Sequence, residues 1–209
     1  MTVAGDDPIY SFSPEEKKRV TENLLLVARD IHAGRYSQHR MSVSLLRDVH
    51  ARIFEGVRDH AGRIRTAAWG SERLVFGPNR SAHRNEVEAR LERVFRRVTE
   101  QVRALEQDPN NPLYAEVAFS LAVHSHADVI HIHPFQDGNG RTSRALLNIL
   151  LVRLGLRPIA VEQCKQEYVA LLNTYFESRD IQPLVDGLLR IGVEQLSEAR
   201  DSGASRHGA

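Results

Sequence analysis

The stretch HPFQDGNGRTSR, residues 133–144, brings together the residue types that a phosphate-binding site needs. Gly138 and Gly140 allow positive φ and let backbone N–H groups approach a ligand without an intervening Cβ atom. The helix expected after them points its N-terminus into the loop, where free N–H groups and the helix dipole favour an anion. Arg141 and Arg144, at i and i+3, share one face of its first turn. The stretch therefore predicts an anion-binding loop.

Asp137 places a negative charge inside this loop. A carboxylate fits there if the anion arrives with a divalent cation, because Mg²⁺ prefers one or two carboxylates together with phosphate oxygens. The loop lacks the Walker A pattern of another common phosphate site, and no lysine lies near it. The residues thus predict a site for a metal–polyphosphate complex rather than for a bare phosphate.

His133 can supply the base for a reaction at that site. Pro134 should end the preceding helix at or near His133, because a residue before proline is pushed out of the α region. An imidazole with an ordinary pKa of ~6.5 suits proton abstraction, and a positioned general base contributes about 10²–10⁴ in rate. Phe135 is expected to anchor the turn as an apolar peg, and Asn139 tolerates left-handed geometry and can donate through its side-chain amide. Together these residues predict transfer of a phosphorus-containing group from a nucleotide to a hydroxyl.

Helical spacing of apolar residues surrounds the loop. Ser13, Pro14 and Glu16 form a capping box with proline at the first helical position. Apolar periodicity, starts and stops predict helices over residues 13–34, 42–57, 85–105, 113–132, 141–155, 163–178 and 180–198. The last stretch, 201–209, is small and polar and is expected to fray.

Residues 60–83 break the helical pattern. Their glycines and Pro78 are turn signals, and Leu74, Val75 and Phe76 form a short β-prone run. This segment, called the flap below, is expected to be an exposed hairpin or an extended loop. The sequence therefore predicts one all-α domain with a single β-like flap.

The composition is that of a soluble globular chain. The 209 residues predict one domain, and 42% hydrophobic residues are enough to bury a core. Lysines and arginines number 28 against 27 acidic residues, so no overall field points to nucleic acid or membrane, and neither is expected as a partner. The single Cys164 excludes an internal disulfide and a cysteine-based zinc site. Because no secretory signal or membrane span is recognisable, we expect a cytoplasmic protein, with delivery into a host cell as an open alternative.

The loop sequence resembles the signature of Fic-domain proteins, H-x-F-x-[DE]-G-N-G-R-x-x-R, at every defined position. HAGRIRT (60–66) and SERLVFGP (71–78) are similar to the segments around the family's flap, and residues 167–189 are similar to its closing helices. The resemblance implies the all-α Fic fold, a helical bundle with a short β-hairpin flap. It places the Fic domain at 42–190, after an N-terminal helical extension (1–41) and before a C-terminal helix end and frayed tail (191–209).

The resemblance also implies an activity, the transfer of AMP from ATP to a Ser, Thr or Tyr hydroxyl of a target protein. It makes His133 the base and Asp137 the ligand of Mg²⁺. By the same resemblance, the α- and β-phosphates would be cradled by Gly138, Asn139 and Gly140. Arg141 would bind the β-phosphate and Arg144 the γ-phosphate, and Phe135 is also implied as a nucleotide-binding residue. The flap residues that would align the target by backbone pairing are Arg73, Leu74, Val75 and Phe76.

Control of the enzyme is a further expectation. Many Fic proteins are inhibited by a helix carrying [ST]-x-x-x-E-[GN], whose glutamate pairs with the residue equivalent to Arg144. Glu22 and Glu55 precede Asn or Gly here, but Lys18 and Ala51 stand where Ser or Thr is required. The chain therefore resembles toxins whose inhibitory helix belongs to a separate antitoxin, while a degenerate inhibitor within 13–34 stays an alternative.

Other functions stay open at this point. The same site could transfer UMP, phosphocholine or phosphate, or the chain could be a non-catalytic module that binds ATP or a partner. A zinc site made of His124, His126, His131 and His133 is disfavoured, because i and i+2 face different directions on a helix. The mixed charges of residues 80–106 indicate a solvated helix face rather than a nucleic-acid surface.

Overall fold

A computed structural model describes the fold of residues 12–204. The expected all-α architecture with a small hairpin is confirmed. The elements, in chain order, are α1 (Pro14–His32), α2 (Val43–Ile53), β1 (Val75–Phe76), β2 (Asn79–Arg80), the 3₁₀ turn η1 (Arg84–Glu86), α3 (Val87–Gln107), α4 (Tyr114–Ile132), α5 (Asn139–Arg153), the 3₁₀ turn η2 (Val161–Cys164), α6 (Lys165–Ser178) and α7 (Gln182–Ala204).

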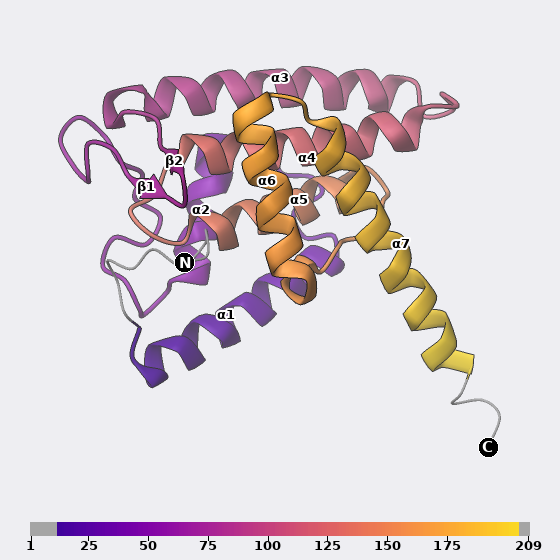
Figure 1. The fold of residues 1–209 in the computed structure, drawn as a ribbon, viewed down its shortest axis with the longest axis horizontal. Helices are drawn as coiled ribbons and strands as arrows, with labels where there is room; N and C mark the ends of the chain where they lie inside the picture. Colours follow the sequence, from indigo (N-terminus) through magenta and orange to yellow (C-terminus); the bar gives the residue numbers. More distant parts are fainter. Residues whose placement is uncertain (1–11, 205–209) are drawn as a thin grey trace.

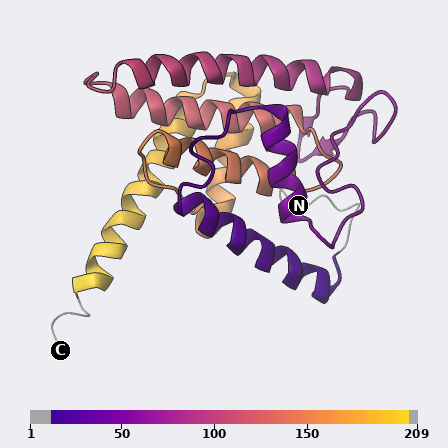
Figure 2. The ribbon, with the colours of Figure 1, turned by 180° about the vertical axis from the view of Figure 1, so that it is seen from behind.

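The helices form layers around α4 and α5, which pack against each other at the centre. Figure 1 shows α3 running beside α4 along the upper edge, with α6 and α7 crossing in front. Figure 2, from behind, shows α1 and α2 on the opposite side, where α1 packs against both α2 and α5. The two central helices are apolar on most sides because neighbours cover them on nearly every face.

The predicted start of α1 is confirmed. The Ser13 side chain accepts a hydrogen bond from the Glu16 N–H (3.1 Å), and the Glu16 carboxylate accepts one from the Ser13 N–H (2.8 Å). Val20, Val27 and Ile31 are buried on its inner face, in the same core as residues of α2 and α5. The described part of the expected N-terminal extension, residues 12–41, therefore packs against the main core through α1.

Three predicted helix boundaries were wrong. α2 ends at Ile53, not near Val57, because the chain turns through Gly56, which has a φ of +71°. α5 begins at Asn139, two residues before the predicted start at Arg141. α7 continues to Ala204, so residues 201–204 are helical rather than frayed; the rest of the predicted tail, residues 205–209, lies outside the described residues.

The hairpin expected in the flap is confirmed. β1 and β2 pair antiparallel, with Val75 opposite Arg80 and Phe76 opposite Asn79. Its tip is joined to α6, since the Asn79 amide donates to the Asn173 side chain (2.9 Å). The first part of the flap, before the hairpin, is joined to the loop after His133 by an isolated β-bridge between Ile64 and Phe135. The flap is therefore attached at both ends to elements of the helical body.

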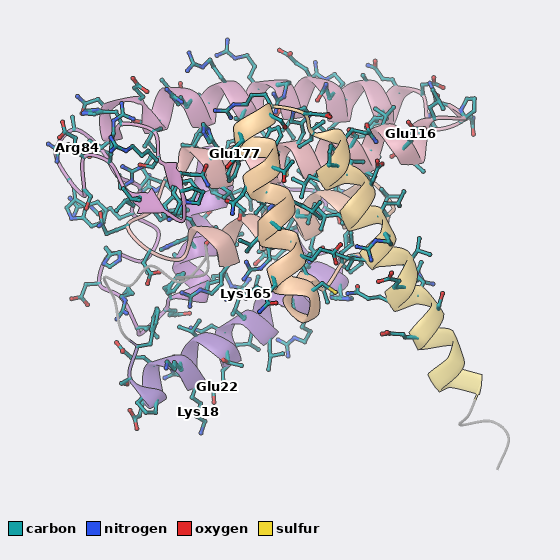
Figure 3. The ribbon with its side chains drawn as sticks, in the orientation of Figure 1. Lys18, Glu22, Arg84, Glu116, Lys165 and Glu177 are labelled. Atoms are coloured by element: carbon teal, nitrogen blue, oxygen red, sulfur yellow. The ribbon has the colours of Figure 1, made fainter. Side chains whose placement is uncertain are left out.

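Charged side chains cover the outside of the molecule. Figure 3 labels six of them: Lys18 and Glu22 on α1, Arg84 on η1, Glu116 on α4, and Lys165 and Glu177 on α6. No helix within residues 12–204 combines the length and the apolar character needed to cross a membrane.

Candidate active site

The loop of residues 133–138 connects the C-terminus of α4 to the N-terminus of α5. α2 packs against α5, and Phe54, the residue that caps the C-terminus of α2, lies within contact distance of Gly138. The hairpin covers His133, and α1 flanks the first turns of α5. The predicted residues of the loop therefore gather where four helices and the hairpin meet, and only the flap residues reach it from a distant part of the chain.

His133 caps α4 in a left-handed conformation, with φ +55° and ψ +62°. Such a conformation in a non-glycine residue costs about 1–3 kcal/mol and persists only where the surroundings impose it. The ring Nδ1 lies 3.3 Å from the Ile130 carbonyl oxygen, which assigns the proton to Nδ1 and the lone pair to Nε2. Nε2 is thus the nitrogen that can accept a proton.

Arg65 holds the backbone at His133 in place. The guanidinium is fully buried and donates to the His133 carbonyl through Nε (3.0 Å) and Nη2 (2.6 Å). It also donates to the carbonyls of Ser71 (3.0 Å) and Ala82 (3.1 Å), which belong to the flap. One side chain therefore joins the end of α4 to both arms of the flap.

The predicted flap residues differ in what they face. Phe76 is buried and stacks on the His133 ring, with centroids 4.2 Å apart and planes 15° apart. Leu74 also points inward, whereas Val75 is 62% exposed. Arg73 is exposed and donates to the Ser81 carbonyl of the opposite arm (3.0 Å). The flap therefore packs on His133 through one face and leaves the other face to solvent.

Asp137 is buried among cations. Its carboxylate lies 3.5 Å from the Arg141 guanidinium and 3.9 Å from that of Arg58, and it accepts a hydrogen bond from the Gly138 N–H. No three His, Cys, Asp or Glu side chains gather at one point within the described residues. A single hard carboxylate beside the N-terminus of α5 suits Mg²⁺, because proteins hold this ion with one or two carboxylates together with water and substrate phosphates.

The two glycines of the loop are required for different reasons. Gly138 has a φ of +76°, and a Cβ there would lie 2.2 Å from the Phe54 ring, so positive φ is confirmed. Gly140 does not use this freedom, since it lies in the first turn of α5 with helical geometry. A Cβ on Gly140 would meet only the end of the Arg144 side chain, at 3.2 Å. Glycine is therefore obligatory at 138 on structural grounds but not at 140.

Phe135 and Asn139 shape the loop from within. The Asn139 amide accepts from the Phe135 N–H (2.8 Å) and donates to the Phe135 carbonyl (2.9 Å). The Phe135 ring is fully buried and stacks on His50, with centroids 3.8 Å apart, which confirms the expected apolar peg. Because both side chains are occupied inside the loop, a nucleotide could reach only their backbone atoms.

Three side chains near the site had no role in the sequence analysis: His50, Arg65 and Gln136. His50 accepts from the Gly62 N–H at Nδ1 (2.8 Å) and donates from Nε2 to the Asp137 carbonyl (3.0 Å). Burial lowers the pKa of His50 to about 3, so the ring is neutral. Gln136 binds the Ser71 N–H (2.8 Å) and the Ser71 hydroxyl (2.7 Å) in the flap. Of these three, only His50 could have been noticed in the sequence, because it is a polar residue on the apolar face of its helix.

An apolar groove lies between α1 and α5, with a volume of about 370 Å³. Leu24, Leu25 and Ile31 line it from α1, and Arg141 and Arg144 enter it from the first turns of α5. The implied phosphate-binding arginines therefore border a groove that continues away from the loop.

Comparison with known protein families and sequences identifies relatives. A model of the Fic/DOC family matches residues 40–151, more than half of the 209 residues. The protein adenylyltransferase Fic of Culex quinquefasciatus is 46% identical over 79 residues, which are 35% of this chain and 16% of that protein. The protein adenylyltransferase Fic of Drosophila mojavensis is 42% identical over 82 residues, again 16% of its length. The chain thus matches only a small part of each curated relative.

Solved structures share the whole fold at low sequence identity. BepC of Bartonella tribocorum, solved with bound AMPPNP, has a TM-score of 0.67 and 14% identity and covers 91% of this chain and 92% of its own. The N-terminal Fic domain of a putative cell filamentation protein from Bartonella quintana, solved with ADP, has a TM-score of 0.65 and 19% identity, with 91% of each chain covered. Fic-1 of Caenorhabditis elegans has a TM-score of 0.64 and 20% identity, and covers 95% of this chain and 56% of its own.

Proposed function

The chain belongs to the Fic/DOC family, and on that premise we propose that it is a protein adenylyltransferase, which moves AMP from ATP to a Ser, Thr or Tyr hydroxyl of a target protein. The observation that carries the proposal is the position of His133 at the point where the N-terminus of α5, with Arg141 and Arg144, meets the flap. Curated relatives named protein adenylyltransferase support it over the matched region.

In the proposed reaction, His133 acts as the general base. Its Nε2 takes the proton of the acceptor hydroxyl while the hydroxyl oxygen forms a bond to the α-phosphorus of ATP. The bond between the α-phosphorus and the bridging oxygen to the β-phosphate breaks, and pyrophosphate leaves with that electron pair. The free N–H groups of α5, together with Arg141 and Arg144, would bind the phosphates and stabilise the charge that develops on them.

Asp137 is the proposed ligand of Mg²⁺. The cation, when bound, supplies positive charge shared between phosphate oxygens. The Arg58 and Arg141 guanidinium groups lie 3.9 Å and 3.5 Å from the Asp137 carboxylate, so a bound cation would share this carboxylate with them.

The flap is proposed to align the target. Val75 is exposed on a two-residue strand whose outer edge can pair with an added strand, and Phe76 next to it touches His133. A target backbone paired with β1 would therefore pass close to the base. Backbone pairing selects an extended segment without reading its sequence, so target choice requires further contacts.

The test is transfer of label from ATP in a bacterial lysate. The protein, ATP and Mg²⁺ are incubated with lysate proteins, and mass spectrometry searches for the mass of one AMP on any protein, including the enzyme. We expect label from α-marked ATP and none from γ-marked ATP, and at least a 10²-fold loss in His133→Ala. Label from γ-marked ATP alone would indicate phosphate transfer, and equal labelling by His133→Ala would exclude the proposed chemistry.

We further propose that a separate inhibitor occupies the groove between α1 and α5. An amphipathic helix with [ST]-x-x-x-E-[GN] could place apolar residues against Leu24 and Leu25 and its glutamate at Arg144. Leu25 is 66% exposed there, so burying it would favour binding. The test is co-expression with small proteins encoded beside the gene: an inhibitor should copurify and suppress labelling, and Leu25→Glu should restore labelling without changing activity alone.

A further inference from the structure

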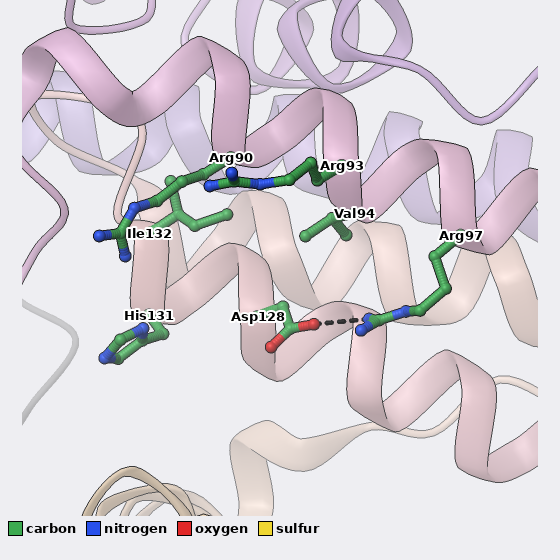
Figure 4. Close-up of a pocket in the computed structure, with 7 residues that line it drawn as sticks. All are labelled: Arg90, Arg93, Val94, Arg97, Asp128, His131 and Ile132. Atoms are coloured by element: carbon green, nitrogen blue, oxygen red, sulfur yellow. Dashed lines mark hydrogen bonds and ion pairs between the residues drawn. The ribbon is translucent and has the colours of Figure 1, made fainter.

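A cluster of arginines lies beside the proposed target-binding face, in a pocket of about 240 Å³ between α3 and α4. Figure 4 shows the guanidinium groups of Arg90 and Arg93 on the α3 side and His131 with Asp128 on the α4 side. Arg179, the residue that caps α6, reaches the same place, since its Nη2 lies 3.2 Å from His131 Nε2. We call Arg90, Arg93, Arg179 and His131 the arginine cluster.

Asp128 is the one carboxylate among the described residues that line the pocket, and an arginine already pairs with it. Asp128 binds the Arg97 guanidinium at 2.6 Å and the Tyr175 hydroxyl at 3.3 Å. Burial, with the nearby Asp128, raises the pKa of Tyr175 to about 12, so the hydroxyl keeps its proton as a donor. Arg97 and Asp128 thus form a structural pair, and the positive charge of the cluster comes from other residues.

The cluster keeps cations available for a ligand. Arg93 makes no hydrogen bond or ion pair with any described residue, and it is exposed. Arg90 pairs with Glu86 (2.6 Å), which is half-buried at the start of α3. Arg179 and Arg93 therefore provide two guanidinium groups that no carboxylate within the described residues compensates.

Arg179 adopts a conformation that would suit glycine, with a φ of +62° at the C-terminus of α6. The left-handed region costs a side chain about 1 kcal/mol relative to glycine. The strained backbone brings the guanidinium onto His131, whose pKa is lowered by burial and then by Arg179 and Arg90. A charged residue at a position where glycine would be free of strain indicates a use for its side chain.

A row of aromatic rings connects the cluster to the proposed base. Phe76 stacks on His133 (4.2 Å between centroids), Phe76 meets Phe176 edge to face (6.1 Å), and Phe176 lies against His131 (5.3 Å). His131 in turn lines the pocket. A polypeptide that lies on the flap and continues past Phe176 would therefore arrive at the arginine cluster.

We propose that the arginine cluster binds carboxylates of an acidic segment in the target protein, adjacent to the residue that receives AMP. The proposal rests on the proposed function, since it assigns the substrate class of that same site. Arginine suits this role because its planar guanidinium binds carboxylates bidentately. A nucleic acid fits less well, because Glu86, Glu88 and Glu92 interrupt the arginines of α3 and a phosphodiester chain needs a continuous basic stripe.

The first test uses the lysate protein that the wild-type enzyme labels. Arg93→Gln and Arg179→Gly should each lower kcat/KM about threefold to tenfold, mainly through KM, and the loss should shrink at high salt. Arg103→Gln is the matched control, since it removes an exposed arginine farther along α3, outside the pocket, and should change nothing. Arg179→Gly should not lower thermal stability, because glycine relieves the positive φ. Equal effects of Arg93→Gln and Arg103→Gln would overturn the proposal.

The second test does not depend on catalysis, and so separates this proposal from the proposed function. An array of synthetic peptides carries one tyrosine flanked by Asp and Glu, or by Asn and Gln at the same positions. The full chain should bind the acidic peptides more strongly, and the Arg93→Gln, Arg179→Gly double variant should lose that preference while Arg103→Gln keeps it. Equal binding of acidic and amide peptides, or displacement of the acidic ones by a single-stranded oligonucleotide, would overturn the assignment even if AMP transfer is observed.

Discussion

Residues at the loop are fixed largely by groups that never face a ligand. The Asn139 side-chain amide makes two hydrogen bonds to the Phe135 backbone, and the His50 ring donates to the Asp137 carbonyl. Each such hydrogen bond contributes about 1 kcal/mol, and a buried partner left without it costs more. These bonds hold the left-handed turn at His133 and Gly138, so the base and the helix terminus keep one relative position.

The variants Gly138→Ala and Gly140→Ala together test this loop geometry, because a Cβ meets different surroundings at the two positions. We expect Gly138→Ala to destabilise the protein by about 2–4 kcal/mol, because the Cβ would meet the Phe54 ring in an unfavourable backbone region. Gly140→Ala should leave stability unchanged or raise it by up to about 1 kcal/mol, since alanine is the better helix residue. Urea unfolding measures both, and equal losses in the two variants would contradict the geometry.

At the scale of elements, the flap depends on its attachment to α4. Its strands are two residues long, and an isolated hairpin of this size is not stable in water. Arg65 supplies the attachment, since its buried guanidinium binds carbonyls of the flap and of His133. The position of Phe76 over His133 is therefore a property of the assembled elements.

Arg65→Lys should release the flap. Lysine has three donors on one nitrogen and cannot reach carbonyls on several sides, so buried acceptors would lose their partners at about 1–3 kcal/mol each. We expect about 3 kcal/mol less stability and faster hydrogen exchange at the Leu74 and Ser81 amides. Arg63→Lys is the control, because Arg63 is exposed and lies over Trp69. If exchange at Leu74 is the same in both variants, Arg65 is not the attachment.

At the scale of the molecule, the core runs without interruption from α1 to α7 and encloses two neutral histidines. Burial lowers the pKa of His50 to about 3 and that of His126 to about 4. Both rings are hydrogen-bonded as neutral groups, His126 to the Tyr168 hydroxyl at 2.7 Å. As the pH falls, these two histidines therefore bind protons at a higher pH in the unfolded chain than in the folded protein.

Stability should consequently fall with pH from about 6.5 downward. Below the ordinary pKa of histidine, ~6.5, the unfolded state binds protons that the folded state excludes, and each pKa unit corresponds to about 1.4 kcal/mol. The two histidines together predict a loss of about 5 kcal/mol at pH ~4.5, on the order of the whole stability of a small domain. His126→Gln should remove about half of this slope in urea unfolding curves. A midpoint that stays constant down to pH ~4 would contradict the prediction.

The local features of this protein follow from short stretches of its sequence. Apolar periodicity located the helices, Pro134 located the end of α4, and Gly77 with Pro78 marked the turn of the hairpin. The loop residues adjoin one another in the chain, so they are close in any fold and their chemistry could be inferred directly. Helix ends were less certain, as at Ile53 and Ala204, because the signals that stop a helix are weaker than those that propagate it.

The distant groups that support that loop are brought to it by tertiary packing. His50 meets Asp137 across 87 residues of chain and Arg65 meets His133 across 68, and such contacts depend on how helices pack rather than on any local pattern. The left-handed turn at His133 and the place of Arg179 beside His131 have the same origin. Packing energy from many residues imposes these conformations, and no short stretch of sequence contains that information.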